Sequence, residues 1–202
     1  GTPPLKKTQA EAESTDSGVM SRPGGFYTKP ETATDNAVQR DADRDVNALT
    51  LAARSEFDAV VKMLRAVGVN VHMFEDTAES EKPDAVFPNN WISTHHDGRV
   101  AIFPMYSALR RRERRQDIVE ELRRHYRVSD VIDYSAFEDD GCYLEGTGSL
   151  VLDHPNKIAY VSLSNRSNPK VIQRFADDFS YEPVTFTSIG SNGQSIYHTN
   201  VM

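Results

Sequence analysis

The chain has 202 residues, a formal net charge of −7 and a single cysteine, Cys142. An acidic chain of this kind is not expected to bind nucleic acid or anionic membranes, because both attract basic surfaces. One cysteine allows no intramolecular disulfide, and the sequence contains no run of about 18 apolar residues that would predict a membrane span. The first residues also lack the apolar stretch of a signal peptide, so we expect a cytoplasmic protein.

Residues 1–17 are polar, with Leu5 as their single large apolar residue. Such a segment buries too little surface to offset the entropy lost on ordering, so we predict a disordered tail. Residues 18–202 are expected to fold as one domain. Its first strand is predicted to begin at Val19 and to end at the Pro-Gly-Gly stretch of residues 23–25.

Apolar residues at helical spacing predict three helices. The first is expected at residues 56–67, with Ser55 as N-cap and Gly68 at its C-terminal end. The second is expected at residues 112–126. The third is expected at residues 169–179, after the N-cap Asn168 and with Pro169 as its first residue.

Strand-like runs lie between these helices, and the dipeptide Asp97-Gly98 predicts a tight hairpin. The hairpin, helix and strand recur in this order, with helix centres about 57 residues apart. We therefore predict an α/β protein of repeated units whose equivalent strands line one centre. Open ends of such an arrangement would expose strand edges, and self-association is expected from them. The predicted strands cover residues 69–74, 85–94, 99–105, 128–132, 149–152, 157–163, 184–187 and 195–202.

Three short stretches place polar groups in strand-like surroundings. Asn89 and Asn90 form an amide pair, and Glu145 precedes a Gly-Thr-Gly sequence that would let it approach a ligand closely. His198 and Asn200 are expected on one face of a strand, where the imidazole could act as general acid or base. We expect the side chains of Asn90, Glu145 and His198 to converge. Each stretch also has a purely structural interpretation, in which these groups are satisfied by the backbone or by solvent.

Other residues of types that often bind metals or substrates are interpreted here as structural. Adjacent His95 and His96 would point to opposite faces of a strand, so no metal site is predicted there. The arginine-rich run around Arg111 is typical of a solvated helix face, with an alternative in which one arginine binds a substrate carboxylate. Cys142 is expected on the strand face opposite to the candidate carboxylate and is interpreted as structural.

Five segments in this order resemble the guanidino-group modifying superfamily, the penteins, which includes arginine deiminases, dimethylarginine dimethylaminohydrolases and amidinotransferases. The likeness is greatest to the citrulline-hydrolysing branch and runs from about Val19 to the last residue. It implies a pentein α/β propeller, with about three of its five ββαβ units present, and a hydrolase of an amino-acid substrate that uses no cofactor and no metal. The segments are residues 87–91, 103–105, 111–115, 144–149 and 197–202.

The resemblance also implies residue roles. His198 corresponds to the general acid and base, and Glu145 to the carboxylate that holds a substrate N–H. Asn90 and Asn200 stand where deiminases use acids, and a neutral amide both donates and accepts. A neutral ureido substrate, with citrulline converted to ornithine, is therefore preferred. The adjacent Asn89 and the arginine Arg111 are further substrate-binding candidates.

The family nucleophile is a cysteine about a hundred residues beyond His198, so the sequence resembles the first three-fifths of such a protein. We therefore expect the 202-residue chain alone to be inactive. Two alternatives stay open. One is an arginine or dimethylarginine hydrolase, or an amidinotransferase, of the same fold. The other is a non-catalytic interaction module that keeps this fold.

Overall fold

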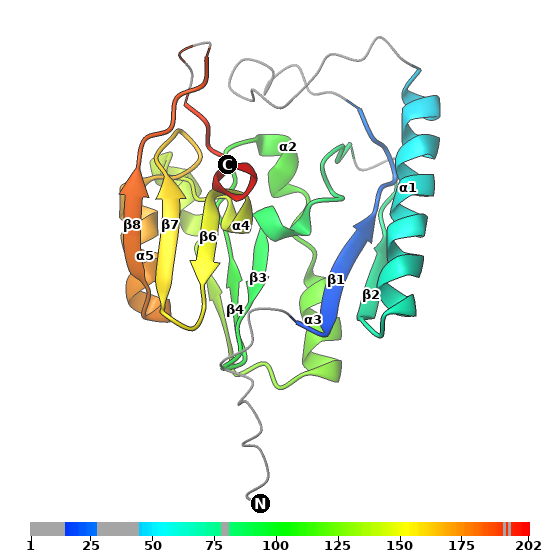
Figure 1. Ribbon diagram of the computed structural model, residues 1–202, viewed down its shortest axis with the longest axis horizontal. Helices are drawn as coiled ribbons and strands as arrows, with labels where there is room; N and C mark the ends of the chain where they lie inside the picture. The colour runs from blue at the N-terminus through cyan, green and yellow to red at the C-terminus, as the bar shows by residue number, and fades with distance from the viewer. Residues whose placement is uncertain (1–14, 28–44, 78–80, 192, 194) are drawn as a thin grey trace, which may run out of the picture.

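The computed structural model describes residues 15–27, 45–77, 81–191, 193 and 195–202. Most of the predicted N-terminal tail lies outside these residues, although Ser17 already belongs to the first strand. Within these described ranges, eight strands form three separate small sheets (Figure 1). The strands are β1 (Ser17–Arg22), β2 (Asn70–Glu75), β3 (Ile92–Thr94), β4 (Arg99–Ile102), β5 (Asp130–Asp133), β6 (Leu150–Asp153), β7 (Ile158–Ser162) and β8 (Glu182–Phe186).

The second and third sheets repeat one topology. In each, an antiparallel hairpin is followed by a helix and then by a strand parallel to the second hairpin strand, in the orders β3-β4-β5 and β6-β7-β8. In the first sheet, β1 and β2 pair in parallel, and one helix connects them along the chain. The predicted repetition of hairpin, helix and strand is therefore confirmed for the second and third units.

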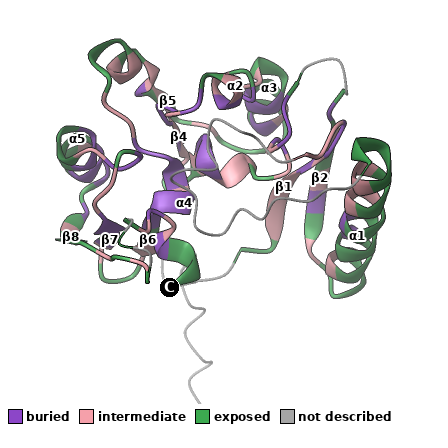
Figure 2. Cartoon of the chain, turned by 90° about the horizontal axis from the view of Figure 1, so that it is seen from above, coloured by how far each residue is buried: buried purple, intermediate pink, exposed green. Residues whose placement is uncertain are grey.

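Among the described residues, the helices α1 (Val46–Ala66), α3 (Gln116–His125) and α5 (Pro169–Phe179) lie on the outside of the molecule, one for each sheet. The single helical turn α4 (Gly146–Ser149) lies between the units (Figure 2). Three apolar clusters are built around Phe57, Trp91 and Phe175, and the Phe175 cluster also contains Ala101 and Phe103 of the second unit. Neighbouring units therefore bury apolar surface against one another, as stacked repeats do. A further short helix is α2 (Ala108–Arg111).

The third helix, α5, has the predicted bounds, and the Asn168 side chain accepts a hydrogen bond from the amide of Lys170 as its N-cap. The first helix begins at Val46 rather than residue 56, because Asp45 provides the cap and Ser55 lies inside the helix. The first turns of α1 are largely exposed, so they lack the apolar spacing that reveals a helix in sequence.

Of the predicted helix at residues 112–126, the structure forms α3 at residues 116–125, and residues 112–115 separate α3 from the short helix α2, which precedes the predicted range. One tertiary ion pair and one local ion pair hold this break. Arg114 contacts Glu138, while Arg115 pairs with Asp117 and has an extended backbone. These contacts outweigh the helix-forming tendency of the arginines.

Two predicted strands are wrong where the candidate site lies. Residues 88–90, expected within a strand, form a single 3₁₀ turn (Pro88–Asn90), in which proline at the first position favours a helical start. Residues 195–202, expected as a final strand, contain a second 3₁₀ turn (Thr199–Val201). A third 3₁₀ segment (Ser135–Asp140) follows β5. No helix among the described residues is long and apolar enough to cross a membrane.

Candidate active site

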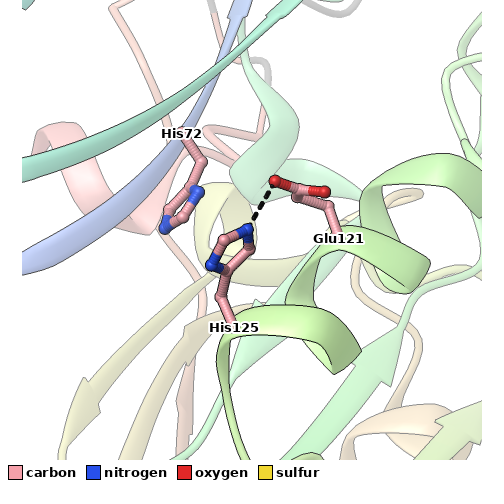
Figure 3. A group of neighbouring side chains, drawn as sticks. All are labelled: His72, Glu121 and His125. Carbon is pink, nitrogen blue, oxygen red and sulfur yellow. Dashed lines mark ion pairs between the residues drawn. The ribbon is translucent and has the colours of Figure 1, made fainter.

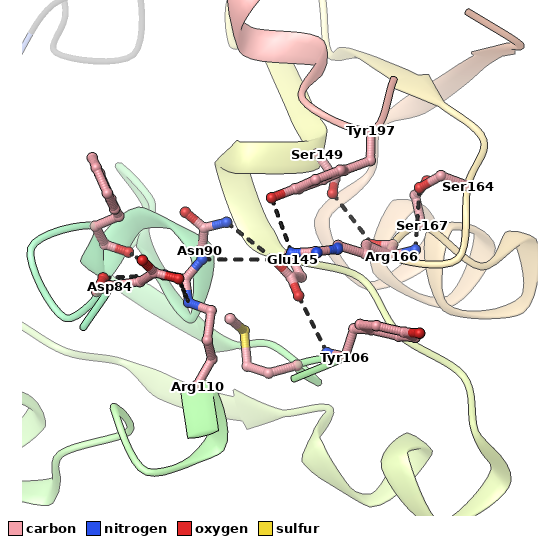
Figure 4. Close-up of polar contacts among 12 residues, drawn as sticks. Asp84, Asn90, Tyr106, Arg110, Glu145, Ser149, Ser164, Arg166, Ser167 and Tyr197 are labelled. Carbon is pink, nitrogen blue, oxygen red and sulfur yellow. Dashed lines mark hydrogen bonds and ion pairs between the residues drawn. The ribbon is translucent and has the colours of Figure 1, made fainter. Parts of the chain in front are cut away.

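Glu145 lies at the centre of a buried polar cluster, and its side chain is fully shielded from solvent (Figure 4). Its Oε1 accepts a hydrogen bond of 3.2 Å from the amide of Tyr106, and its Oε2 accepts one of 3.3 Å from Nδ2 of Asn90. The Nη1 atoms of Arg110 and Arg166 each lie 3.7 Å from the same Oε2. A carboxylate without water is costly, and these two cations with two hydrogen bonds compensate for the lost hydration.

The glycines after Glu145 allow two segments of the chain to approach closely. Gly146 has a φ of +40°, and a Cβ added to it would lie 2.3 Å from the carbonyl oxygen of Asn89. A Cβ on Gly148 would lie 2.4 Å from Nδ2 of Asn90. The predicted role of these glycines was to bring the backbone near a ligand. In the structure they bring α4 against the turn that contains the two asparagines.

Arg110 is buried, with 3% of its surface exposed, and it joins the carboxylates of this cluster. Its Nε and Nη2 atoms each donate a 3.0 Å hydrogen bond to Glu113, and Nη2 also donates to the Phe87 carbonyl at 3.1 Å. Burial by itself lowers the pKa of Arg110, but the carboxylates of Glu113 and Glu145 raise that pKa above its usual value. The side chain is therefore a permanent cation.

Arg166 links Glu145 to the C-terminal part of the described chain. Its Nη1 donates a 3.0 Å hydrogen bond to the Tyr197 hydroxyl, and its guanidinium lies over the Tyr197 ring at 4.2 Å and over the Tyr106 ring at 5.3 Å. Burial raises the pKa of Tyr197, so the hydroxyl is neutral at physiological pH. The Tyr197 ring lies 3.7 Å from the ring of His198, which places the imidazole beside the cluster.

His198 immediately precedes the last 3₁₀ turn and is half-buried. Burial, followed by the nearby Arg166 cation, lowers the pKa of His198 to about 4, while the Glu145 and Asp84 carboxylates oppose this shift. The imidazole is therefore neutral near pH 7, and its lowered pKa makes it a weaker base than an ordinary histidine. This neutral imidazole is linked through Tyr197 and Arg166 to the fixed carboxylate of Glu145, so the region offers a proton-transfer group and an acceptor for N–H groups.

The structure brings together three of the predicted site residues. Asn90 hydrogen-bonds directly to Glu145, although the two are 55 residues apart in sequence. His198 joins them through Tyr197 and Arg166. All three were expected on strands, and all three instead lie in or next to single helical turns. Their convergence follows from the loops that meet at the centre of the molecule.

The other predicted residues lie elsewhere. Asn200 is exposed and does not share a strand face with His198, because no strand forms there. Arg111 donates from Nε to the Met105 carbonyl at 3.0 Å, and the same atom lies 3.3 Å from Oε2 of Glu138. Asn89 is half-buried beside Asn90, with its carbonyl facing α4. The substrate-binding roles of Asn200, Arg111 and Asn89 stay predictions.

Four charged residues of the cluster are not predicted from the sequence, namely Asp84, Arg110, Glu113 and Arg166. Arg110 belongs to a basic run that looks solvated, and nothing in the run distinguishes it from its neighbours. Arg166 lies in a polar loop of residues 164–167, which has no periodic pattern. Asp84 follows a proline and keeps 28% of its side chain exposed, so it looks like an ordinary turn residue. These residues become candidates for a functional site only because tertiary packing gathers them around Glu145.

The remaining suggestive residues lie away from this cluster. Cys142 is half-buried against the apolar cluster of α5, and its thiol donates to the Asp140 carbonyl at 3.6 Å. His95 is buried with its ring 4.1 Å from that of Phe179, whereas His96 is exposed. Burial lowers the pKa of His95 to about 3. The two histidines therefore face different surroundings, as expected from their adjacency.

Solved structures share this fold. A dimethylarginine dimethylaminohydrolase from Pseudomonas aeruginosa in complex with citrulline matches with a TM-score of 0.58 and 14% identity, over 85% of this chain and 61% of that one. The product-bound N-terminal domain of ArgZ, an arginine dihydrolase from cyanobacteria, matches with a TM-score of 0.63 and 15% identity, over 89% and 59%. The chain thus spans about 60% of the length of these two proteins. Curated protein sequences gave no match.

These similarities define the class as an α/β pentein fold, of which the chain carries a part. A family model described as N,N dimethylarginine dimethylhydrolase, eukaryotic, matches residues 22–202. The chain belongs to this family. This family agrees with the superfamily that the sequence motifs resemble.

Proposed function

We propose that the protein takes part in the hydrolysis of a C–N bond in a guanidino or ureido amino acid. Glu145 would hold N–H groups of the planar substrate group, and His198 would transfer protons to and from it. The observation that carries this proposal is that a fully buried carboxylate bonds to Asn90 and is linked, through Arg166 and Tyr197, to the neutral imidazole of His198. Such fixed donors and acceptors act without reorganising during the reaction.

N,N-Dimethylarginine is the first substrate candidate. The name of the matched family supports it, and so does the charge of the cluster. The carboxylates of Asp84, Glu113 and Glu145 exceed the cations of Arg110 and Arg166 by one charge, and Asp84 is the most exposed of them. A guanidinium cation would offset this excess. Hydrolysis consumes one water and gives citrulline and dimethylamine.

Citrulline is the second candidate, as the sequence motifs suggested. The supporting observation is that a neutral amide, Asn90, bonds to Glu145, whose charge is already opposed by Arg110 and Arg166. An amide can donate to a ureido carbonyl and accept from a ureido NH₂, whereas a carboxylate can only accept. This site would then prefer a neutral group over a cation.

Covalent catalysis requires a nucleophile within reach of its base. Cys142 is the single cysteine of the sequence, and its thiol lies beside Asp140 rather than at Glu145. We propose that a cysteine outside residues 1–202 attacks the guanidinium carbon. His198, having taken up the thiol proton, would give it to the departing amine and then activate the water that releases the product. An amino acid is the only partner that this chemistry requires.

The test is turnover of N,N-dimethylarginine and of citrulline by the complete reading frame and by residues 1–202. Product citrulline and ornithine are quantified by mass spectrometry. We expect the complete protein to be active and residues 1–202 to be inactive. In the complete protein, H198N should reduce kcat by at least about a hundredfold, within the range of a lost general acid or base. The matched variant H96N, at an exposed histidine, should keep wild-type activity.

Equal turnover by wild type and H198N would contradict the role of His198. E145Q tests the carboxylate separately, because it keeps the shape and removes the charge. If E145Q raises KM for dimethylarginine far more than for citrulline, the cationic substrate is supported. An inactive but folded complete protein would favour the non-catalytic module instead.

A further inference from the structure

A second cluster of ligating side chains lies on the outside of the molecule, away from Glu145. Its members are His72 on β2 and the pair Glu121 and His125 on α3 (Figure 3). One ligating atom from each residue lies within 4.8 Å of the others. The sequence predicts no metal site, because His72 is far from Glu121 and His125 along the chain.

Glu121 and His125 are neighbours because they are four residues apart on one helix face. Oε1 of Glu121 lies 2.9 Å from Nε2 of His125, and the Figure 3 view shows this pair facing His72. Oε2 of Glu121 lies 3.2 Å from Arg124, which fixes the orientation of the carboxylate. The ring centroids of His72 and His125 are 5.2 Å apart.

His72 is also held in position. Its Nε2 lies 2.8 Å from the Tyr126 hydroxyl and 3.1 Å from Nδ2 of Asn70. Outer hydrogen bonds of this kind fix the ring orientation of a ligating histidine and are part of most protein metal sites. The cluster thus has two imidazoles and one carboxylate, and polar groups outside it support His72 and Glu121.

We propose that His72, Glu121 and His125 bind a divalent transition-metal ion, with zinc as the best match. Two histidines and one carboxylate are a known zinc ligand set, and a water completes the tetrahedron. Ligand atoms on tetrahedral zinc lie about 3.3 Å apart, as follows from bond lengths of about 2.0–2.2 Å. Small rotations reach this spacing, because the His125 side chain is 53% exposed and free to adjust. The imidazoles lose any proton at the coordinating nitrogen when the ion binds.

The ion would connect two repeated units. His72 lies on the strand β2 of the first unit, whereas α3 belongs to the second. The neighbouring connection between these units is polar, with Arg115 donating to the Glu75 carbonyl at 2.8 Å. A metal that binds the folded protein stabilises it by mass action. Zinc should therefore raise the unfolding temperature by holding β2 to α3.

The test is zinc titration of the metal-free protein by isothermal calorimetry, with thermal unfolding followed by circular dichroism. Wild type should bind one Zn²⁺ per chain and gain stability. H125A should bind at least about tenfold more weakly, because even an outer-sphere change costs about 10–100-fold. H96A, which removes an exposed histidine at the β3–β4 turn, should bind like wild type. Mg²⁺ should not compete, since it prefers oxygen ligands.

H125A is the primary variant because this side chain is exposed, so its loss should leave the metal-free protein folded. E121Q provides a second variant that keeps the size of the side chain and weakens the ligand. C142S separates this site from binding at the single thiol and should retain zinc. Equal zinc affinity in wild type, H125A and E121Q would overturn the proposal. The absence of zinc binding by wild type would also overturn it, because the three residues would then be joined by hydrogen bonds alone.

Discussion

Replacement of Gly148 by alanine tests how α4 and the asparagine turn hold the buried carboxylate. The added Cβ would lie 2.4 Å from Nδ2 and 3.0 Å from Cγ of Asn90. The asparagine side chain must therefore move, and it must give up its 3.3 Å hydrogen bond to Glu145. Both groups are buried, so no water is available to replace this bond.

The cost can be estimated from two contributions. Overpacking of a dense site costs about 1–3 kcal/mol. A hydrogen bond to a charged group contributes about 1.5–3 kcal/mol. Part of this free energy is retained if the whole turn that contains Asn90 shifts together and keeps the bond. We therefore expect G148A to lose about 2–4 kcal/mol of unfolding free energy. For a chain of this size, that corresponds to a fall of roughly 4–16 °C in Tm.

The assay is urea and thermal unfolding followed by circular dichroism. The matched variant is G18A, because a Cβ on Gly18 has no heavy atom within 4 Å and Gly18 lies in β1. G18A should be neutral or slightly stabilising, since alanine restricts the unfolded chain. If G148A were as stable as G18A, the close approach of α4 to Asn90 would not hold the carboxylate, and the argument for a preformed site would fail.

Two further predictions concern buried charges and pH. R110M should destabilise the protein by about 3–5 kcal/mol, because it leaves buried carboxylates without their cation. The control R112M changes an exposed arginine and should cost less than about 1 kcal/mol in the same urea experiment. The pKa values of His95 and His198 are lowered to about 3 and about 4, so the unfolded state binds more protons below their ordinary value of 6.5. The stability from these histidines is fully present above pH 6.5 and is lost as the pH falls toward 4. H95F should reduce the stability loss between pH 7 and pH 5, whereas H96F should leave it unchanged; an equal loss in both variants would contradict the assignment.

The sequence predicts elements well where local signals and packing agree. α5 has an N-cap, a proline at its first position and apolar residues on one face, and each signal was borne out. The β3–β4 hairpin likewise follows from Asp97 and Gly98, where Gly98 has a φ of +87°. In both elements the local preference and the tertiary structure favour the same conformation.

The candidate site could be predicted only in part. Asn90, Glu145 and His198 stood out by residue type, but all three were expected on strands and lie in or beside helical turns. Contacts between distant segments decide these conformations, as Gly148 against Asn90 shows. Arg166 has no local signal, because its importance comes from the residues that bury it. Single-sequence patterns do not contain this information.

Hydrolysis of N,N-dimethylarginine in ¹⁸O-labelled water by the complete reading frame tests the central claim most directly. A C–N hydrolase places one oxygen from water in the ureido group of each citrulline formed. The account predicts singly labelled citrulline together with an equal amount of dimethylamine, and loss of both products in H198N. Unlabelled citrulline, or labelled citrulline formed equally well by H198N, would contradict the proposed role of the Glu145 and His198 site.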